Sequence, residues 1–219
     1  MDHWTASSRR LATLSAAVVA VVGVAYLAVI GSWLVRVGSP QEPIGDPFLL
    51  WMEVLTILSA VAIAALATGM WARARSSLPL TALWLLVSGL TGSVTTIGVH
   101  WIQLSAVRPL WRAGRIEDYR LIWPSVLFAV EYLAWDVAIG LFMLCTARVL
   151  RVVLGERIAS VIWGFGGVLC LVGTTGPASG AMVWQNVAVV GYAILLPAGA
   201  ALLSAGVWRR AREPGSPWS

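Results

Sequence analysis

Three acids and one histidine fall inside long apolar stretches of the sequence: Glu53, Glu131, Asp136 and His100. An ionised carboxylate in hydrocarbon costs on the order of 3 kcal/mol or more, so such residues are seldom kept without a function. No arginine falls inside these stretches and the chain has no lysine, which leaves His100 as the cationic candidate at this depth. Without a cation beside it, a desolvated carboxyl favours its protonated form. We therefore expect at least one of these acids to act as a general acid.

The two acids in the fourth apolar stretch have different surroundings. Glu131 and Asp136 are five residues apart, which separates them by about 140° around an α-helix. Tyr132 lies one turn from Asp136, and Trp135 lies one turn from Glu131. We expect Asp136 to be the principal acid, so that Asp136→Asn abolishes turnover without unfolding the chain. Two alternatives stay open: Glu131 only hydrogen-bonds a neighbouring helix, and His100 is either structural or a catalytic base.

Composition indicates which elements must position these residues. The chain of 219 residues is 59% hydrophobic and only 11% charged, and its mean hydropathy is +0.83. Apolar stretches of roughly 20 residues, the length that crosses a bilayer, recur along it. The sequence thus predicts an all-α membrane bundle forming a single integral-membrane domain over residues 1–219. Its six helices are expected near residues 11–33, 48–71, 78–103, 122–146, 158–174 and 182–208.

The arginines predict how the bundle is oriented. Assigning the loops to alternate sides puts ten of the fifteen arginines on the side that holds both chain ends and five on the other. Cytoplasmic loops carry the excess of basic residues, so both termini are expected in the cytoplasm, with the protein in the cytoplasmic (inner) membrane of a bacterium. The net charge of +5 is accounted for by topology, and no nucleic-acid partner is expected.

Strongly polar residues inside the predicted helices gather at one depth. With the chain ends inside, the rise of 1.5 Å per residue places them in the outer half of the membrane. We therefore expect one shared pocket for a lipophilic small molecule, made from Glu53, His100, Gln103, Glu131, Asp136, Gln185 and Asn186. The glycines of the fifth helix, Gly164, Gly166, Gly167 and Gly173, are expected to allow close helix packing.

Metal and cofactor chemistry are not predicted. The chain has no HxxxH, HxxE or ExxH pairing, no acid-rich DDxxD motif and no glycine-rich phosphate loop. We therefore expect neither a metal nor a cofactor. Cys145 and Cys170 form no CxxC motif and fall at opposite depths, which argues against a disulfide.

Two short elements resemble a known family. WMEV (residues 51–54) and AWDV (134–137) are similar to the tryptophan-flanked acids of the integral-membrane terpene cyclases of meroterpenoid and indole-terpenoid biosynthesis. The last predicted helix departs from that family, because it carries Gln185 and Asn186 in place of an acid. The resemblance implies metal-independent cyclisation of a prenyl chain, often a terminal epoxide, by carboxylic-acid protonation. From the residues themselves together with this resemblance, we expect Asp136, Glu53, Glu131 and His100 to be catalytic. We expect the substrate contacts to be Trp51, Trp101, Gln103, Tyr132, Trp135, Gln185 and Asn186.

The residues also allow two other functions. Acids inside a membrane relay protons in transporters and channels, so a proton-coupled small-molecule transporter is the first alternative. A non-catalytic membrane assembly factor is the second. The oligomeric state is not predicted.

Overall fold

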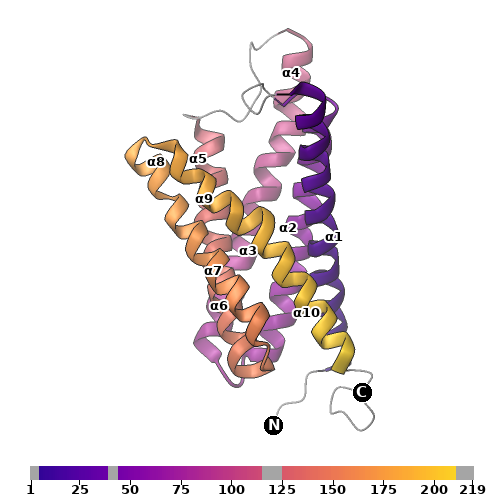
Figure 1. Ribbon diagram of the computed structural model, residues 1–219, viewed down its shortest axis with the longest axis vertical. Helices are drawn as coiled ribbons and strands as arrows, with labels where there is room; N and C mark the ends of the chain where they lie inside the picture. Colours follow the sequence, from indigo (N-terminus) through magenta and orange to yellow (C-terminus); the bar gives the residue numbers. More distant parts are fainter. Residues whose placement is uncertain (1–4, 39–43, 115–124, 211–219) are drawn as a thin grey trace.

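The computed structural model describes residues 5–38, 44–114 and 125–210, and these residues form helices and short connections without any strand. Within these described residues, six helical segments are long and apolar enough to cross a membrane. The prediction of an all-α membrane bundle is thus confirmed. In Figure 1, α1 begins and α10 ends at the lower end of the bundle, where α7 also begins.

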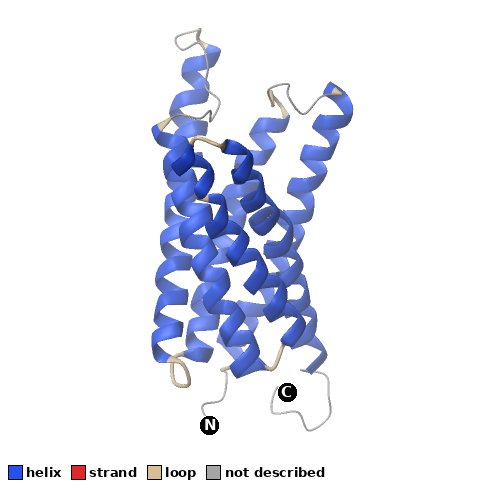
Figure 2. Cartoon of the chain, turned by 60° about the vertical axis from the view of Figure 1, so that its left-hand side comes forward, coloured by secondary structure: helices blue, strands red, loops and turns tan. Residues whose placement is uncertain are grey.

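The six spans are built from fifteen helical elements, some of which are short π-helical (η) turns. The spans cover Ala6–Val37, Phe48–Ala74, Pro79–Arg112, Val126–Leu154, Arg157–Ser179 and Met182–Arg209. The elements are α1 (Ala6–Val37), α2 (Phe48–Ala74), α3 (Pro79–Ile102), η1 (Gln103–Val107), α4 (Arg108–Arg112), α5 (Val126–Tyr132), η2 (Leu133–Ile139), α6 (Gly140–Val149), η3 (Leu150–Leu154), α7 (Arg157–Gly173), α8 (Thr175–Ser179), η4 (Met182–Trp184, a 3-10 turn), α9 (Gln185–Val189), η5 (Val190–Leu195) and α10 (Leu196–Arg210). Figure 2 shows the helices running side by side along one axis.

The third span is longer than the sequence predicts. The apolar pattern ends at Gln103, yet the helix continues through η1 and α4 to Arg112. Arg108 and Arg112, which were expected in a connecting loop, are therefore helical. Both arginines bind Asp46 of the connection between α1 and α2, so this helical end is tied to a segment distant in the chain.

Local chemistry explains where several helices begin and end. Thr5 caps α1 by accepting a hydrogen bond from the backbone N–H of Ser8 at 3.2 Å. Ser125 caps α5 in the same way, accepting from Phe128 N–H at 3.2 Å. Gly155 ends η3 in the left-handed conformation, with φ of 69°, which an L side chain seldom adopts. These caps fix where the helices carrying the candidate residues start and stop.

Glycines of α7 lie where neighbouring helices approach most closely. A Cβ atom on Gly173 would lie 2.3 Å from Ala188 Cβ, and one on Gly166 would lie 2.4 Å from Met143 Cε. A Cβ on Gly167 would lie 2.7 Å from the carbonyl oxygen of Gly140. The packing role predicted for these three glycines is confirmed. Gly164 leaves more room, because its nearest neighbour would be 3.7 Å away.

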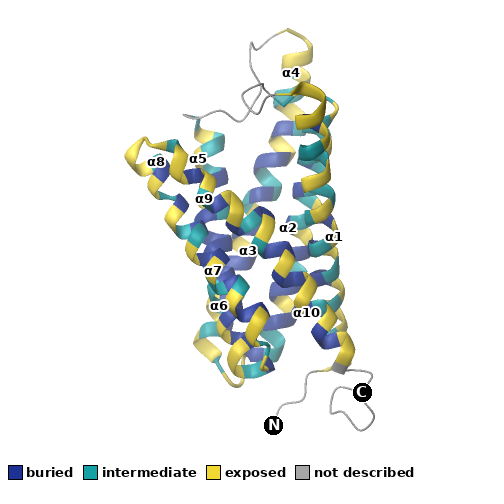
Figure 3. Cartoon of the chain, viewed as in Figure 1, coloured by how far each residue is buried: buried dark blue, intermediate teal, exposed yellow. Residues whose placement is uncertain are grey.

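The half of the bundle nearer the two chain ends has an apolar core. Leu66, Met70, Phe142 and Trp163 are fully buried there among other aliphatic side chains. Trp163 donates its indole N–H to the carbonyl oxygen of Leu196 at 2.9 Å, so α7 and α10 are joined at this level. In Figure 3 the buried residues face the interior of the bundle and the exposed ones its outer surface. The other half, beyond this core, holds the candidate site.

Candidate functional site

A cavity of about 550 Å³ lies between α1, α2, α3, α5, η2, η5 and α10. This volume is within the range of small-molecule sites, which is roughly 300–1,000 Å³. Most of its lining is apolar or aromatic. The lining residues are Val19, Val22, Gly23, Tyr26, Ile44, Leu49, Met52, Glu53, Leu55, Thr56, Ser59, His100, Phe128, Glu131, Tyr132, Trp135, Tyr192, Ala193, Leu196 and Pro197.

In the cavity wall, α1 contacts the start of α10 closely. A Cβ atom on Gly23 would lie 2.5 Å from Cβ of Pro197, which is closer than real Cβ atoms approach. Only a residue without a side chain allows α1 to come this near. Pro197 is the second residue after the π-helical turn η5, and the proline ring interrupts regular α-helical hydrogen bonding there. The Gly23–Pro197 contact therefore holds two walls of the cavity together.

Three buried titratable side chains meet on the cavity wall. His100 Nδ1 hydrogen-bonds with Glu53 Oε2, and His100 Nε2 lies 2.8 Å from Glu131 Oε1. Glu53, His100 and Glu131 are only 4%, 6% and 8% exposed. They come from α2, α3 and α5, so one imidazole ring connects three helices. We call this group the Glu53–His100–Glu131 cluster.

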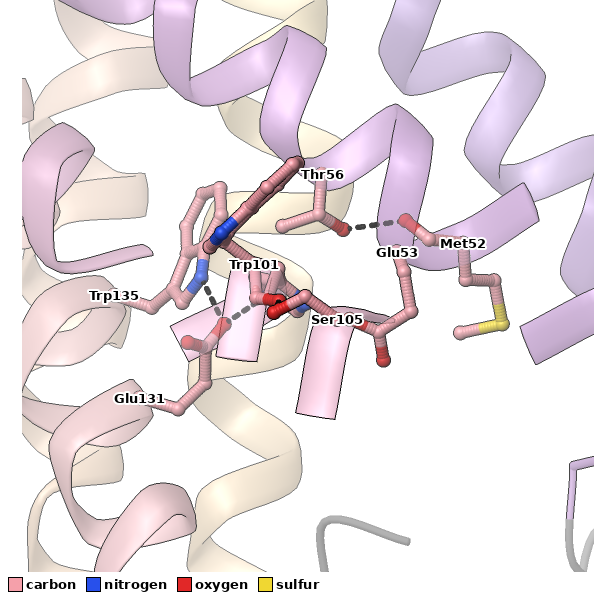
Figure 4. Close-up of polar contacts among 8 residues, drawn as sticks. Met52, Glu53, Thr56, Trp101, Ser105, Glu131 and Trp135 are labelled. Atoms are coloured by element: carbon pink, nitrogen blue, oxygen red, sulfur yellow. Dashed lines mark hydrogen bonds and ion pairs between the residues drawn. The ribbon is translucent and has the colours of Figure 1, made fainter. Parts of the chain in front are cut away.

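Glu131 has a further partner on its own helix. The indole N–H of Trp135 donates to Glu131 Oε1 at 2.6 Å, one turn along the chain. Glu131 Oε1 thus has two partners, whereas its second oxygen, Oε2, is buried and has no hydrogen-bond partner among the described residues. Figure 4 shows Glu131 and Trp135 extending from one side of the site and Glu53 from α2 on the other. Glu131 Oε2 is therefore a buried acceptor of the cluster that no described residue satisfies.

The contacts of His100 fix the charge of the cluster. A nitrogen and a carboxylate oxygen that face each other at hydrogen-bond distance need a proton between them, so the two contacts require two protons. Two carboxylates at −2 and a doubly protonated imidazole at +1 leave a net charge of −1. Moving either proton from nitrogen to oxygen does not change this total. The cluster becomes neutral when a third proton binds to a carboxylate oxygen, and Glu131 Oε2 is one such oxygen without a partner among the described residues.

Aromatic rings cover several walls of the cavity. The rings of Trp135 and Tyr192 are 5.2 Å apart at 42°, and those of Phe128 and Tyr132 are 4.4 Å apart at 34°. Tyr26 of α1 also lines the cavity. Tyr26, Phe128 and Tyr192 were not predicted as site residues. The sequence does offer a signal for two of them, because Tyr26 is the single tyrosine of the first predicted helix and Tyr192 that of the last.

Asp136 lies in a second polar site and does not line the cavity. It is fully buried in η2, where its Oδ1 accepts a hydrogen bond of 3.2 Å from Gln185 Nε2 of α9. Asp136 Oδ2 and Gln185 Oε1 are buried without partners among the described residues. The expectation of one shared pocket thus needs correction, because rotation around the fourth span turns Glu131 and Asp136 toward different neighbours.

Other residues predicted as substrate contacts also lie away from the cavity. Trp51 and Trp101 are 55% and 63% exposed on the outer faces of α2 and α3. Asn186 is exposed, and Gln103 is buried in η1 outside the cavity lining. Their helices have the correct depth, but these side chains point elsewhere around the helix axes. Among the residues predicted as substrate contacts, Tyr132 and Trp135 line the cavity.

An ion-pair network secures the connection beside the cavity. Asp46 Oδ2 accepts hydrogen bonds from Arg108 Nε at 3.2 Å and Nη2 at 2.7 Å, and from Arg112 Nη2 at 2.9 Å. Burial raises the pKa of Asp46, but the hydrogen bonds and charges of the two arginines outweigh it, so this pKa lies below its ordinary value. Ile44, two residues earlier, lines the cavity. The network therefore anchors a segment of the cavity wall to α4.

The described residues contain no group of three His, Cys, Asp or Glu side chains arranged to hold a metal ion. In the Glu53–His100–Glu131 cluster both imidazole nitrogens point at carboxylates, so the ring separates the two acids and the donors do not converge.

The site thus combines an apolar, aromatic cavity with a cluster that shares two protons and can accept a third.

Comparisons of the chain with protein-family models, with curated protein sequences and with solved structures gave no match.

Proposed function

We propose that the protein is a membrane-embedded cyclase or isomerase that protonates an epoxide or alkene of a lipophilic prenyl (terpenoid) substrate. The observation that carries this proposal is the Glu53–His100–Glu131 cluster in the wall of an aromatic cavity, where Glu131 Oε2 is buried without a partner among the described residues. A carboxyl there can hold a proton without giving it to another protein group. The enzyme needs no metal or cofactor in this scheme, because the substrate is converted into an isomer.

The proton balance of such a reaction is simple. Glu131 Oε2 gives its proton to the epoxide oxygen or alkene carbon, and the C–O or π bond breaks to leave a carbocation. An internal alkene of the substrate attacks this cation and forms the new C–C bond. Loss of a proton from the product cation returns one proton to Oε2. Glu53 and His100 keep Glu131 oriented and remain hydrogen-bonded throughout.

The cavity suits a cationic intermediate. After proton transfer the cluster carries a charge of −1, which attracts a carbocation held nearby. Faces of Trp135, Tyr192 and Tyr26 are electron-rich and stabilise cations without reacting with them as water would. The aliphatic lining limits access of water, which would quench the cation.

Transport is less well supported by the same features. A proton-coupled transporter needs polar groups on both sides of its binding site. In the described residues of the apolar half, Ser88, Thr146 and Ser160 are buried, and each donates its hydroxyl to a backbone carbonyl. No continuous polar path leads from the cluster through this part of the chain.

The direct test is turnover by membranes that contain the protein. They would be incubated with epoxidised prenyl-phenols and prenyl-indoles, and products of unchanged mass would be sought by chromatography and mass spectrometry. We expect an isomeric cyclic product that is lost in Glu131→Gln and kept in Glu156→Gln. Glu156 is a fair control because its carboxylate lies beside Gly206 at the far end of the bundle. Absence of any isomer across a broad polyprenoid panel would refute the proposal.

A further inference from the structure

Among the described residues, no arginine lies in the cavity to balance the negative charge of the cluster. The fifteen basic residues of the chain besides histidine are all arginines, and those that the structure describes are absent from the cavity lining. Arg108 and Arg112 bind Asp46, and the guanidinium of Arg36 lies over the ring of Phe48, 5.9 Å from its centre. A net charge of −1 in an apolar cavity is costly. It can be balanced by the third proton or by a cation that enters the cavity.

The shape and lining of the cavity select the kind of cation. Phe128, Tyr132, Trp135, Tyr192 and Tyr26 line the cavity together with Glu131. Such rings attract organic ammonium groups, whose alkyl substituents are easily desolvated. Small inorganic ions need several oxygen ligands to replace their water, and this mostly apolar wall offers few.

We propose that the cavity is a binding site for lipophilic monocations, namely tertiary or quaternary ammonium compounds with a hydrocarbon chain. The ammonium group lies beside the carboxylate of Glu131, next to the rings of Trp135 and Tyr192 that line the cavity with it. The hydrocarbon chain lies along the aliphatic wall formed by α1 and α2, which includes Val19, Val22 and Leu49. This site does not depend on the proposed reaction, because it follows from the charge of the cluster and from the aromatic lining.

A matched pair of ligands tests the role of charge. Geranyl-trimethylammonium would be compared with its neutral isostere, in which a tert-butyl group replaces the trimethylammonium head. Radiolabelled forms of both would be equilibrated with the purified full chain in lipid nanodiscs, with empty nanodiscs subtracted. We expect the cation to bind at least about tenfold more tightly than the isostere. Equal affinities for the two compounds would overturn the proposal.

Variants locate the site. Glu131→Gln and Glu53→Gln each remove one carboxylate from the cluster, so each is expected to lower the affinity for the cation at least about tenfold and to leave the isostere unaffected. Trp135→Phe should weaken cation binding, whereas Trp84→Phe should not, because Trp84 is 60% exposed on the outside of α3. Using either glutamate keeps the test valid if one variant does not fold. Wild-type affinity in both folded glutamate variants would refute the site.

The outcome also separates this inference from the proposed function. Cation binding that depends on Glu131, without turnover of any prenyl substrate, would support the cation site and count against the cyclase. If the protein turns over a prenyl substrate but geranyl-trimethylammonium neither binds to it nor inhibits the reaction, the cyclase is supported and the cation site is refuted.

Discussion

Trp135 donates its indole N–H to the carboxylate of Glu131 at 2.6 Å, and its ring packs against the ring of Tyr192 with the two centroids 5.2 Å apart. One side chain therefore orients the candidate acid and also connects the fourth span to the sixth. The indole contacts Glu131 through its N–H and Tyr192 through its ring, so the position of Glu131 depends on how the fourth and sixth spans pack.

Trp135→Phe keeps the aromatic ring but removes the N–H donor. We expect the loss of a hydrogen bond to a charged group to cost about 1.5–3 kcal/mol of stability, measured by thermal unfolding in detergent. Turnover should fall between about tenfold and a hundredfold because Glu131 is less well oriented. Trp84→Phe is the control for general effects of losing an indole. If Trp135→Phe has wild-type turnover, the orienting role is wrong.

His100→Ala removes the ring that connects both carboxylates. It leaves two buried acids without partners, and we expect a loss of about 3–5 kcal/mol in the free energy of unfolding. The triple variant Glu53→Gln/His100→Ala/Glu131→Gln removes the charges too, so it should recover part of this loss. A triple variant less stable than His100→Ala would show that the cluster is not the cause.

Asp136→Asn and Gln185→Leu test the second polar site. An asparagine at 136 can still accept from Gln185 Nε2 and can also donate to Gln185 Oε1, which has no partner among the described residues. We expect Asp136→Asn to fold and, because residue 136 does not line the cavity, to retain turnover. Gln185→Leu leaves Asp136 without its donor and should cost about 1–3 kcal/mol. Loss of turnover in folded Asp136→Asn would return Asp136 to the role of principal acid.

Gly23→Ala tests the close contact between α1 and α10 in the cavity wall. The new Cβ would lie 2.5 Å from Pro197, so α1 must move away from α10. We expect a loss of about 1–3 kcal/mol in stability, as for other overpacked cores. Gly31→Ala in the same helix has no neighbour within 4 Å and should gain about 0.5–1 kcal/mol from helix propensity. Equal effects of the two substitutions would contradict the close contact.

Asp46→Asn tests the ion-pair network through its pH dependence. The pKa of Asp46 is lower in the folded chain than its ordinary value of about 4. Its contribution to stability is therefore present above that ordinary value and is lost as the pH falls through the lowered folded pKa. The stability difference between wild type and Asp46→Asn should be constant from neutral pH to about pH 5 and should shrink below about pH 4. A difference that grows on acidification would contradict the network.

The spans could be predicted from the sequence because length and apolarity are local properties. The end of the third helix at Arg112 could not, since that end is tied to Asp46, which lies far away in the chain. The packing role of Gly166 and Gly173 was also predictable, because small residues have few other uses in an apolar helix.

The candidate site was only partly predictable. Helical rise put Glu53, His100 and Glu131 at one level, and they meet there. The sequence does not reveal how each helix is rotated toward its neighbours, and this rotation separates Asp136 from the cavity and leaves Trp101 exposed. The π-helical turns η2 and η5 add to the difficulty, because they change the angle between successive residues without a recognisable pattern.

α1 begins and α10 ends at the same end of the bundle (Figure 1). The cavity lies farther from that end, in the half of the bundle that holds Glu53, His100 and Glu131. Reporter proteins fused to either end of the chain must therefore report the same compartment, and a tag in the turn at Gly180 must report the opposite one. The result also identifies the leaflet from which a lipid-dissolved ligand reaches Glu131. If the fused ends are cytoplasmic, that ligand comes from the outer leaflet, and any enzyme that makes it in the cytoplasm depends on its flip across the membrane.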